Sequence, residues 1–573
     1  MTRSRRGRTA LAAAGAAIAF LAAHSAPATA ASSQAVEDTP TLTEPASPTT
    51  PPPQHFLNAV QATRIALRSA KLRSELAKHE RTTHRAFAKG PRRWQVSWYD
   101  GGKEIGQVIV DERTMRAVEV WTGPQAAWQM ARGLPGAFGR KVNSPLVWIP
   151  LMAVFFAAFF DWRRPLRMLH LDLLVLLSFS LSHVFFNRGE IDTSVPLVYP
   201  VLAYLLVRAL WIAYARRPPA PGWRPLVPAT WLVLALIFLA GFRVGLNLTN
   251  SNVIDVGYSG VIGADRIAHG EELYGNFPSN DPSGDTYGPV NYYTYIPFEL
   301  ALPWSGRWDE LPAAHAAALF FDLATIVALL WLGRRLRRGR EGTMLGILLA
   351  FAWASYPYTL FVSNSNANDA LVALLVVLSF GALAAPRARG AVLALAGAAK
   401  FAPLALAPLF ASYDRRRLRD AALFAVSLAA VTAIVYAVVL PDGGVSELWD
   451  RTVGFQLGRD SPFSVWGLHP RLDWLQTTLK VAAIALAFLV ALVPRRKSPL
   501  QLAALGAAVM IALQLVITHW FYLYIVWWFP LVMVALLLHQ TGAGADAEPV
   551  VATRREPAAG SARSSLQAPA ASR

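Results

Sequence analysis

The chain of 573 residues contains no cysteine. This absence excludes a disulfide framework and any metal site with cysteine ligands. Charged residues are also few, at 16% of the chain against 54% hydrophobic residues. Several apolar runs approach the length needed to cross a bilayer whose hydrocarbon core is about 30 Å thick. The composition therefore indicates a polytopic membrane protein and excludes a soluble one.

Positive charge is in excess, with a formal net charge of +18. In a soluble protein such an excess would favour nucleic-acid binding. Here most of it lies in short arginine clusters between the apolar runs, which the preference for basic residues on the cytoplasmic side of a membrane explains better. We therefore expect membrane lipids, and no nucleic acid, among the partners.

The N-terminus has the features of a targeting segment. Residues 1–30 combine a basic start, an apolar run and the small-residue cleavage site Ala28-Thr29-Ala30, which predicts a signal peptide. An uncleaved anchor is the alternative. Residues 31–54 are rich in Pro, Thr, Ser and Ala, and predict a disordered linker.

A small α+β unit is expected over residues 55–140. Phe56–Lys89 has helical composition, and the alternation of apolar and polar residues that follows predicts a three-stranded meander with turns at Asp100-Gly101 and Asp111–Thr114. One helix and a meander resemble a PepSY-like extracytoplasmic domain, which implies a binding or regulatory module. Three histidines of this unit lack metal-ligand spacing, so we expect them at the surface: His55, His79 and His84.

The remainder predicts an all-α membrane domain with about eleven crossings, counted by the alternation of arginine clusters. Residues 145–224 supply three of them and residues 225–540 the others. Gly390–Phe410 is bounded by basic clusters on both sides and carries Lys400 between prolines, so we expect a re-entrant pair of short helices there. This topology places the protein in the plasma membrane, with residues 55–140 and a loop at 243–311 outside and a disordered tail, 541–573, in the cytoplasm.

The loop at 243–311 is acidic and aromatic. Between Arg243 and Glu310 it holds nine acidic side chains and three basic ones. Asp255 follows an apolar run closely, so we expect it near the membrane surface, where a carboxylate can accept a proton from a hydroxyl. For the other acids a solvated loop is the simpler interpretation.

Four places along residues 225–538 carry a family resemblance. The first is Asp255-Val256-Gly257-Tyr258 with Leu273-Tyr274, and the second is Tyr287-Gly288-Pro289 with the apolar piece after it. The third is the stretch around Lys400 and Pro403, and the fourth is His519-Trp520-Phe521-Tyr522. In this order and membrane placement they resemble the GT-C-fold glycosyltransferases, most closely the actinobacterial polyprenyl-phosphate-mannose-dependent family, glycosyltransferase family 87. The chain departs from that pattern in its first three spans, its N-terminal unit and Gly288, where a proline is common.

The resemblance implies a polyprenyl-phosphate sugar donor, a glycolipid or glycan acceptor, and no bound metal or cofactor. Asp255 is the expected general base, with Asp265 the second choice. The remaining site residues fall into two groups. Lys400, Arg266, Arg243 and His519 are expected to hold the donor phosphate. Tyr258, Tyr287, Tyr292 and Asn368 are expected to line the sugar or lipid groove. Lys400 also suits an ion-paired or snorkelling role. For the whole chain, a flippase of lipid-linked precursors and a non-catalytic assembly protein remain alternatives.

Overall fold

The computed structural model describes residues 42–133, 140–215, 225–278, 281, 283–307, 310–413, 418–459 and 461–540. The signal peptide, the first part of the linker and the C-terminal tail expected from the sequence lie outside these residues. The chain divides into two compact units, Met1–Val120 and Trp121–Arg573.

The first unit is built on an antiparallel sheet with strand order β1-β2-β3-β4-β5. Its strands are β1 (Leu42–Thr43), β2 (Thr83–Lys89), β3 (Arg93–Asp100), β4 (Lys103–Asp111) and β5 (Arg116–Thr122). Asp100 pairs with Lys103, so β3 and β4 are joined by Gly101 and Gly102 alone. Both glycines have positive φ, as a two-residue hairpin turn of this kind requires. The predicted hairpin is therefore confirmed.

Two expectations for this unit are corrected. The segment expected to be one helix forms α2 (Ala59–Ala66), α3 (Ala70–Leu76) and then strand β2. The side chain of His55, expected at the surface, is buried, and its Nδ1 lies 2.9 Å from Glu112 Oε1. Glu112 also accepts hydrogen bonds from the Phe56 and Leu57 backbone and from Trp94 Nε1. The resemblance to PepSY-like domains stays a prediction.

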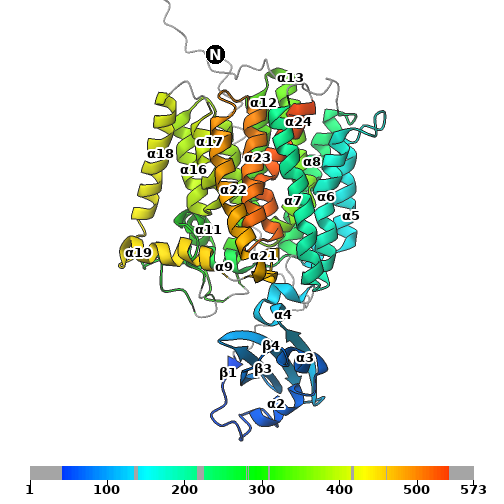
Figure 1. Ribbon diagram of the computed structural model, residues 1–573, viewed down its shortest axis with the longest axis vertical. Helices are drawn as coiled ribbons and strands as arrows, with labels where there is room; N and C mark the ends of the chain where they lie inside the picture. Colours follow the sequence, from blue (N-terminus) through cyan, green and yellow to red (C-terminus); the bar gives the residue numbers. More distant parts are fainter. Residues whose placement is uncertain are drawn as a thin grey trace, which may run out of the picture. The chain divides into compact units, whose positions relative to one another are not determined.

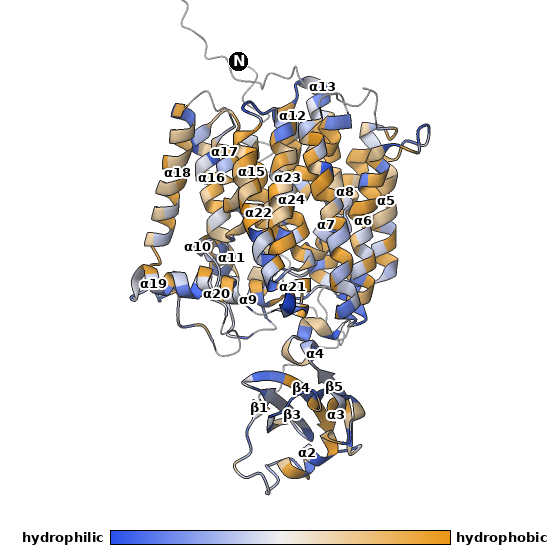
Figure 2. Ribbon diagram, viewed as in Figure 1, coloured by the Kyte–Doolittle hydropathy of each residue, from blue (hydrophilic) through white to orange (hydrophobic). Residues whose placement is uncertain are grey.

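The second unit is a helix bundle. Eight of its described helices are long and apolar enough to cross a membrane, or nine if one bent pair counts as a single span. Hydrophobic residues predominate along them (Figure 2). The eight are α6 (Met168–Asn187), α7 (Ile191–Tyr214), α8 (Ala229–Thr249), α12 (Pro312–Leu336), α18 (Leu418–Ala437), η5 with α22 (Pro470–Leu492), α23 (Pro499–Val516) and η6 with α24 (Tyr522–Gln540). The bent pair is α13 (Gly339–Ser355) with α14 (Pro357–Asn364).

About eleven crossings were expected, against these eight or nine helices of the described residues. The count of eleven is reached only with the bent pair and two shorter helices, α5 (Pro145–Phe159) and α15 (Asp369–Gly381). Within the stretch expected to be a re-entrant pair, α16 (Pro386–Ala399) ends before Lys400, and the short helices η3 (Ala402–Leu406) and α17 (Ala407–Ala411) pack against it. The helix is therefore interrupted at Lys400, as the sequence predicted. The re-entrant path through the membrane stays a prediction.

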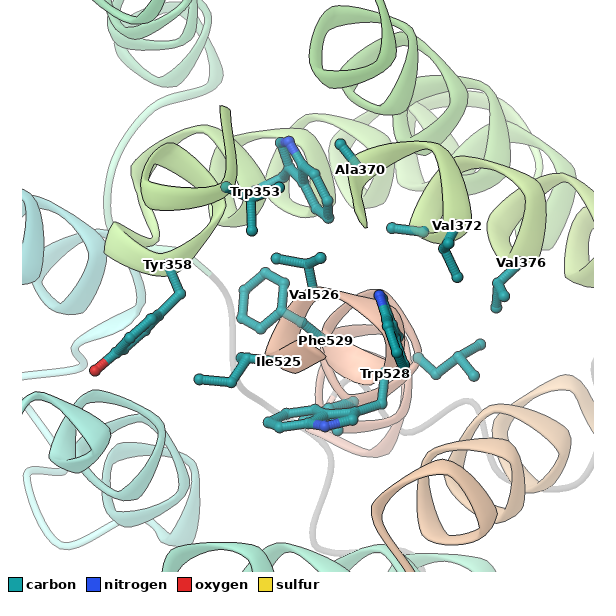
Figure 3. Packing of buried hydrophobic residues seen from close by; sticks show 14 of the residues in the cluster. Trp353, Tyr358, Ala370, Val372, Val376, Ile525, Val526, Trp528 and Phe529 are labelled. Atoms are coloured by element: carbon teal, nitrogen blue, oxygen red, sulfur yellow. The ribbon is translucent and has the colours of Figure 1, made fainter. Parts of the chain in front are cut away.

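Helix α24 (Ile525–Gln540) forms the centre of the bundle, since 94% of its span is buried. Ile525, Val526, Trp528 and Phe529 of α24 pack against apolar side chains of α13, α14 and α15, including Trp353 (Figure 3). By contrast, α18 stands at the edge of the bundle (Figure 1), with 6% of its span buried. Its exposed apolar side chains suit a lipid environment rather than water.

The segment expected to be an extended outer loop is largely helical. It contains α9 (Asp255–Ala268), α10 (Pro289–Tyr293) and α11 (Ile296–Ala301). Glycines spaced by three along α9 allow close contact with its neighbours: a Cβ at Gly260 would meet the Tyr295 ring, and one at Gly263 the Tyr292 ring. This packing fixes α9 against α10 and α11, at the end of the bundle where Figure 1 also shows α19 (Gly444–Trp449) and α21 (Val465–Leu468). We call this the α9 end.

Candidate active site

A cavity of about 760 Å³ lies at the α9 end. This volume is within the usual range for ligand pockets, about 300–1,000 Å³. Four parts of the chain build its wall: the segment before α5, the start of α9, the loop after α9, and the helical stretch from α19 to α20 (Phe455–Gly458). The lining residues are Trp128, Asp255, Asp281, Ser283, Asp450, Gly454, Phe455, Gly458 and Arg459.

Asp255 is the first residue of α9, and its carboxylate faces this cavity. One of its oxygens, Oδ1, accepts a hydrogen bond from the Val256 backbone at 2.9 Å. The residue is exposed to the cavity, but the protein packed around it partly desolvates the carboxylate, and this raises the pKa of Asp255 above its ordinary value. Arg459 opposes the shift. A carboxylate with a raised pKa is a better proton acceptor once it is ionised.

A second carboxylate lies beside the first. Ser259, one turn along α9 from Asp255, donates a hydrogen bond to Asp281 Oδ2 at 2.7 Å. Burial raises the pKa of Asp281 to about 6, and the negative charge of Asp255 adds to the shift. The two groups therefore titrate in one shared environment.

Arg459 supplies positive charge to the cavity wall. Its guanidinium carbon lies 5.3 Å from the ring centre of Trp128 and 5.8 Å from that of Phe455. Among the described residues no carboxylate forms an ion pair with it. A guanidinium stacked on rings keeps its in-plane N–H donors available for an anion.

Lys400 lies deeper than Arg459, at the break after α16. Its Nζ is 2.8 Å from Asp369 Oδ1, and the same oxygen accepts a hydrogen bond from Trp527 Nε1. Three rings surround the ammonium at 5.4–5.6 Å, those of Tyr287, Tyr524 and Trp527. Lys400 is thus ion-paired, as one alternative expected. It is also close enough to Asp255 for their charges to interact.

His519 lies between the last two spans, with Nδ1 2.8 Å from Ser461 Oγ and its ring 5.6 Å from that of Trp128. Burial lowers its pKa well below the ordinary value, and the charges of Arg459 and Lys400 add to this. The imidazole is therefore neutral near pH 7, so it can donate a hydrogen bond but adds no charge.

The expected groove residues separate into two sets. Tyr287 faces Lys400, and burial raises its pKa, so it remains a phenol. Tyr258 and Tyr292 are buried in protein: the Tyr258 ring packs edge-on against Trp304, and Tyr292 packs on Gly263 and donates a hydrogen bond to the Gly284 carbonyl. Asn368 is buried next to Asp369 and donates a hydrogen bond to Asn291.

Three expected site residues are not brought to the cavity. Arg243 is buried on α8, and its Nε donates to Asp322 at 2.7 Å while Nη2 contacts the other oxygen of that carboxylate. Asp265 and Arg266 lie in the last turns of α9, about 15 Å along the helix from Asp255. Asp265 contacts His269, and Arg266 contacts Glu271 and the Glu272 carbonyl. Arg243 thus joins α8 to α12, and Asp265 and Arg266 make contacts around the end of α9.

Three cavity residues were not predicted from the sequence: Arg459, Trp128 and Asp281. Arg459 shares a long loop with Arg451 and Arg471, and nothing in the spacing distinguishes it. Within the described parts of the chain no three His, Cys, Asp or Glu side chains are placed to hold a metal ion. The expectation of a reaction without a bound metal stays a prediction.

Comparison with known protein families places part of the chain. The family model described as glycosyltransferase family 87 matches residues 286–518. A search of curated proteins found nothing that matches the chain. Tyr287, Lys400 and Arg459 fall inside the matched range, whereas Asp255 and Trp128 precede it.

Proposed function

We propose, because residues 286–518 match the model of glycosyltransferase family 87, that this membrane glycosyltransferase moves a hexose, mannose in the first instance, from a polyprenyl-phosphate donor to a glycolipid or glycan acceptor of the cell envelope. Transfer proceeds in one displacement with inversion at the anomeric carbon. Asp255 is the general base.

The observation that carries this proposal is the cavity in which a carboxylate and a guanidinium face the same space. The acceptor hydroxyl oxygen forms a bond to the anomeric carbon while the bond from that carbon to the phosphate oxygen breaks. Asp255 takes the hydroxyl proton, and polyprenyl phosphate leaves with the electron pair. A phosphate leaving group is already anionic and stable, so no acid on the protein is needed to protonate it.

Positive charge in and beside the cavity suits the leaving group. Arg459 offers a planar set of N–H donors, which matches phosphate geometry. Lys400 uses one ammonium proton on Asp369 and has two further donors. Neutral His519 contributes at most one hydrogen bond. The pairing with Asp369 fixes the direction in which Lys400 presents its remaining donors.

The proposal includes an orientation. Arg334, Arg335, Arg337, Arg338 and Arg340 cluster between α12 and α13, at the opposite end of these helices from α9. Basic clusters favour the cytoplasmic side. The cavity is therefore extracytoplasmic, as is the N-terminal unit, and the C-terminus is cytoplasmic.

The test uses membranes with and without the full-length protein, supplied with radiolabelled polyprenyl-phosphate hexoses. Protein-dependent appearance of label in a new glycosidic linkage, with the anomeric configuration inverted, supports the proposal. Movement of labelled donor across the membrane without a new linkage would support the flippase alternative. Retention of configuration would contradict Asp255 as a simple base.

A further inference from the structure

The segment at residues 121–133 contributes to the cavity although it lies far outside the matched range. It follows the sheet of the first unit in sequence and precedes the first apolar helix. It contains α4 (Pro124–Ala127) and η1 (Gln129–Arg132). Between these two short helices stands Trp128, a half-buried cavity-lining residue.

One hydrogen bond and one close backbone contact hold this segment against the turn between α6 and α7. Gln125 Nε2 donates to the Gly189 carbonyl at 3.2 Å, in the turn between α6 and α7. Gly133 lies so close to this turn that a Cβ there would meet Asn187 O at 2.7 Å. Arg132 Nε closes the segment on itself by donating to the Gln125 carbonyl at 2.8 Å. The contacts on either side of Trp128 therefore hold the backbone that carries its ring.

The neighbours of the Trp128 ring are the cationic and polar groups of the site. Arg459 lies over it at 5.3 Å, the His519 ring is 5.6 Å away, and Phe463 packs against it edge to face. Phe455 provides a second ring near the same guanidinium. A carboxylate in place of these rings would bind the N–H donors of Arg459 and offset its charge. Aromatic rings hold the guanidinium in place while its N–H donors and its positive charge stay available for an anion.

We propose that Trp128 is a positioning residue for the donor phosphate, acting through Arg459. The segment at 121–133 thereby completes a phosphate site that the matched domain leaves open on one side. This inference rests on the proposed function, and it assigns a role to a residue that precedes α5. It adds no group to the reaction itself.

The test measures transfer from polyprenyl-phosphate mannose in membranes carrying the full-length protein. Cation–π contacts are worth about 0.5–2 kcal/mol, so Trp128→Ala should raise KM for the donor by about 2- to 30-fold. The value of kcat should change much less, because Asp255 is untouched. Trp128→Phe keeps a ring and should recover part of the loss. Inhibition by polyprenyl phosphate should weaken in parallel with the rise in KM.

Two controls separate positioning from folding. Trp121→Ala removes an aromatic ring from the same segment, where it contacts Arg132 rather than Arg459, and it should leave donor KM within about twofold of the wild-type value. In an Arg459→Gln background, Trp128→Ala should have little further effect on KM, since the two residues act as one unit.

The outcomes distinguish this inference from the proposed function. If Arg459→Gln impairs donor use and Trp128→Ala does not, the inference is overturned and the donor site stands. Equal losses in Trp121→Ala and Trp128→Ala would assign the effect to folding of the segment and also overturn it. If Arg459→Gln itself leaves KM unchanged, the donor phosphate site proposed above is wrong.

Discussion

At the scale of single residues, desolvation and two nearby cations act in opposite directions on the pKa of Asp255. Desolvation raises the pKa of Asp255, and Arg459 and Lys400 lower it. The base must be ionised to accept a proton, so activity should fall as the pH drops through its pKa. This fall on the acidic side of the pH profile is called the acid limb. Because the pKa of Asp255 is raised, the midpoint of the acid limb should lie above pH 3.8, the ordinary pKa of an aspartate.

The substitution Arg459→Gln should move this acid limb to higher pH. Removing the positive charge removes an interaction that favours the ionised carboxylate, so the pKa of Asp255 rises further. The measurement is kcat/KM for the donor across pH, which reports groups of the free enzyme.

Arg451→Gln is the matched control. Arg451 lies in the same helical stretch, but it is paired with Asp285 and Glu447 and does not line the cavity. Asp281, with a pKa of about 6, is present in both variants. Equal acid limbs in the two variants would show that Arg459 does not act on Asp255.

Individual residues also show where prediction from the sequence was possible. Lys400 was predicted as a site residue because it is a lone cation inside an apolar run, close to prolines. Arg459 was not predicted as a site residue, because its place at the cavity depends on α9, which lies about 200 residues earlier in the sequence. Arg243 seemed available because its partner Asp322 stands 79 positions away on another helix.

At the scale of elements, α10 packs closely against α16. This contact holds the loop that precedes α10, here called the Tyr287 loop, next to Lys400. A Cβ at Gly288 would lie 2.1 Å from the Ala398 carbonyl oxygen of α16. Gly288 is the position at which the sequence departs from the family pattern, and the structure supplies a reason. The backbone here must touch α16 two residues before Lys400.

Gly288→Ala should therefore displace the Tyr287 loop from Lys400. Overpacking of this kind costs about 1–3 kcal/mol of stability. We expect a lower thermal midpoint in detergent together with weaker donor use. Gly245→Ala on α8 is the control, since a Cβ there meets nothing within 4 Å. An unchanged midpoint and unchanged KM in Gly288→Ala would mean that this contact does not position the loop.

The same scale explains which elements the sequence predicted poorly. Long apolar helices were located well, because hydropathy and arginine clusters mark both their bodies and their ends. Helix α9 was expected to be loop, since its glycines and polar residues hide a helical face that exists only to fit the Tyr292 and Tyr295 rings. In the first unit, strand β2 was hidden in a helix-like composition and is fixed by its pairing with β3.

At the scale of the whole molecule, the proposal depends on which side of the membrane the cavity opens. The absence of cysteine makes this directly testable with single-cysteine variants and a membrane-impermeant maleimide. Ser305→Cys, near the start of α12, should react in intact cells. Glu341→Cys, beside the arginine cluster before α13, should react only after permeabilisation. The opposite pattern would place the donor phosphate on the wrong face and contradict the proposed reaction.

The central claim is that Asp255 takes the acceptor proton, and its most direct test is transfer by Asp255→Asn beside Asp265→Asn. The first change is nearly isosteric and removes the base, so transfer should fall by at least about 10²–10⁴-fold while donor binding persists. The second alters a carboxylate at the far end of α9, outside the cavity lining, and should cost little. Near-normal transfer by Asp255→Asn, with a deep loss in Asp265→Asn, would contradict the account.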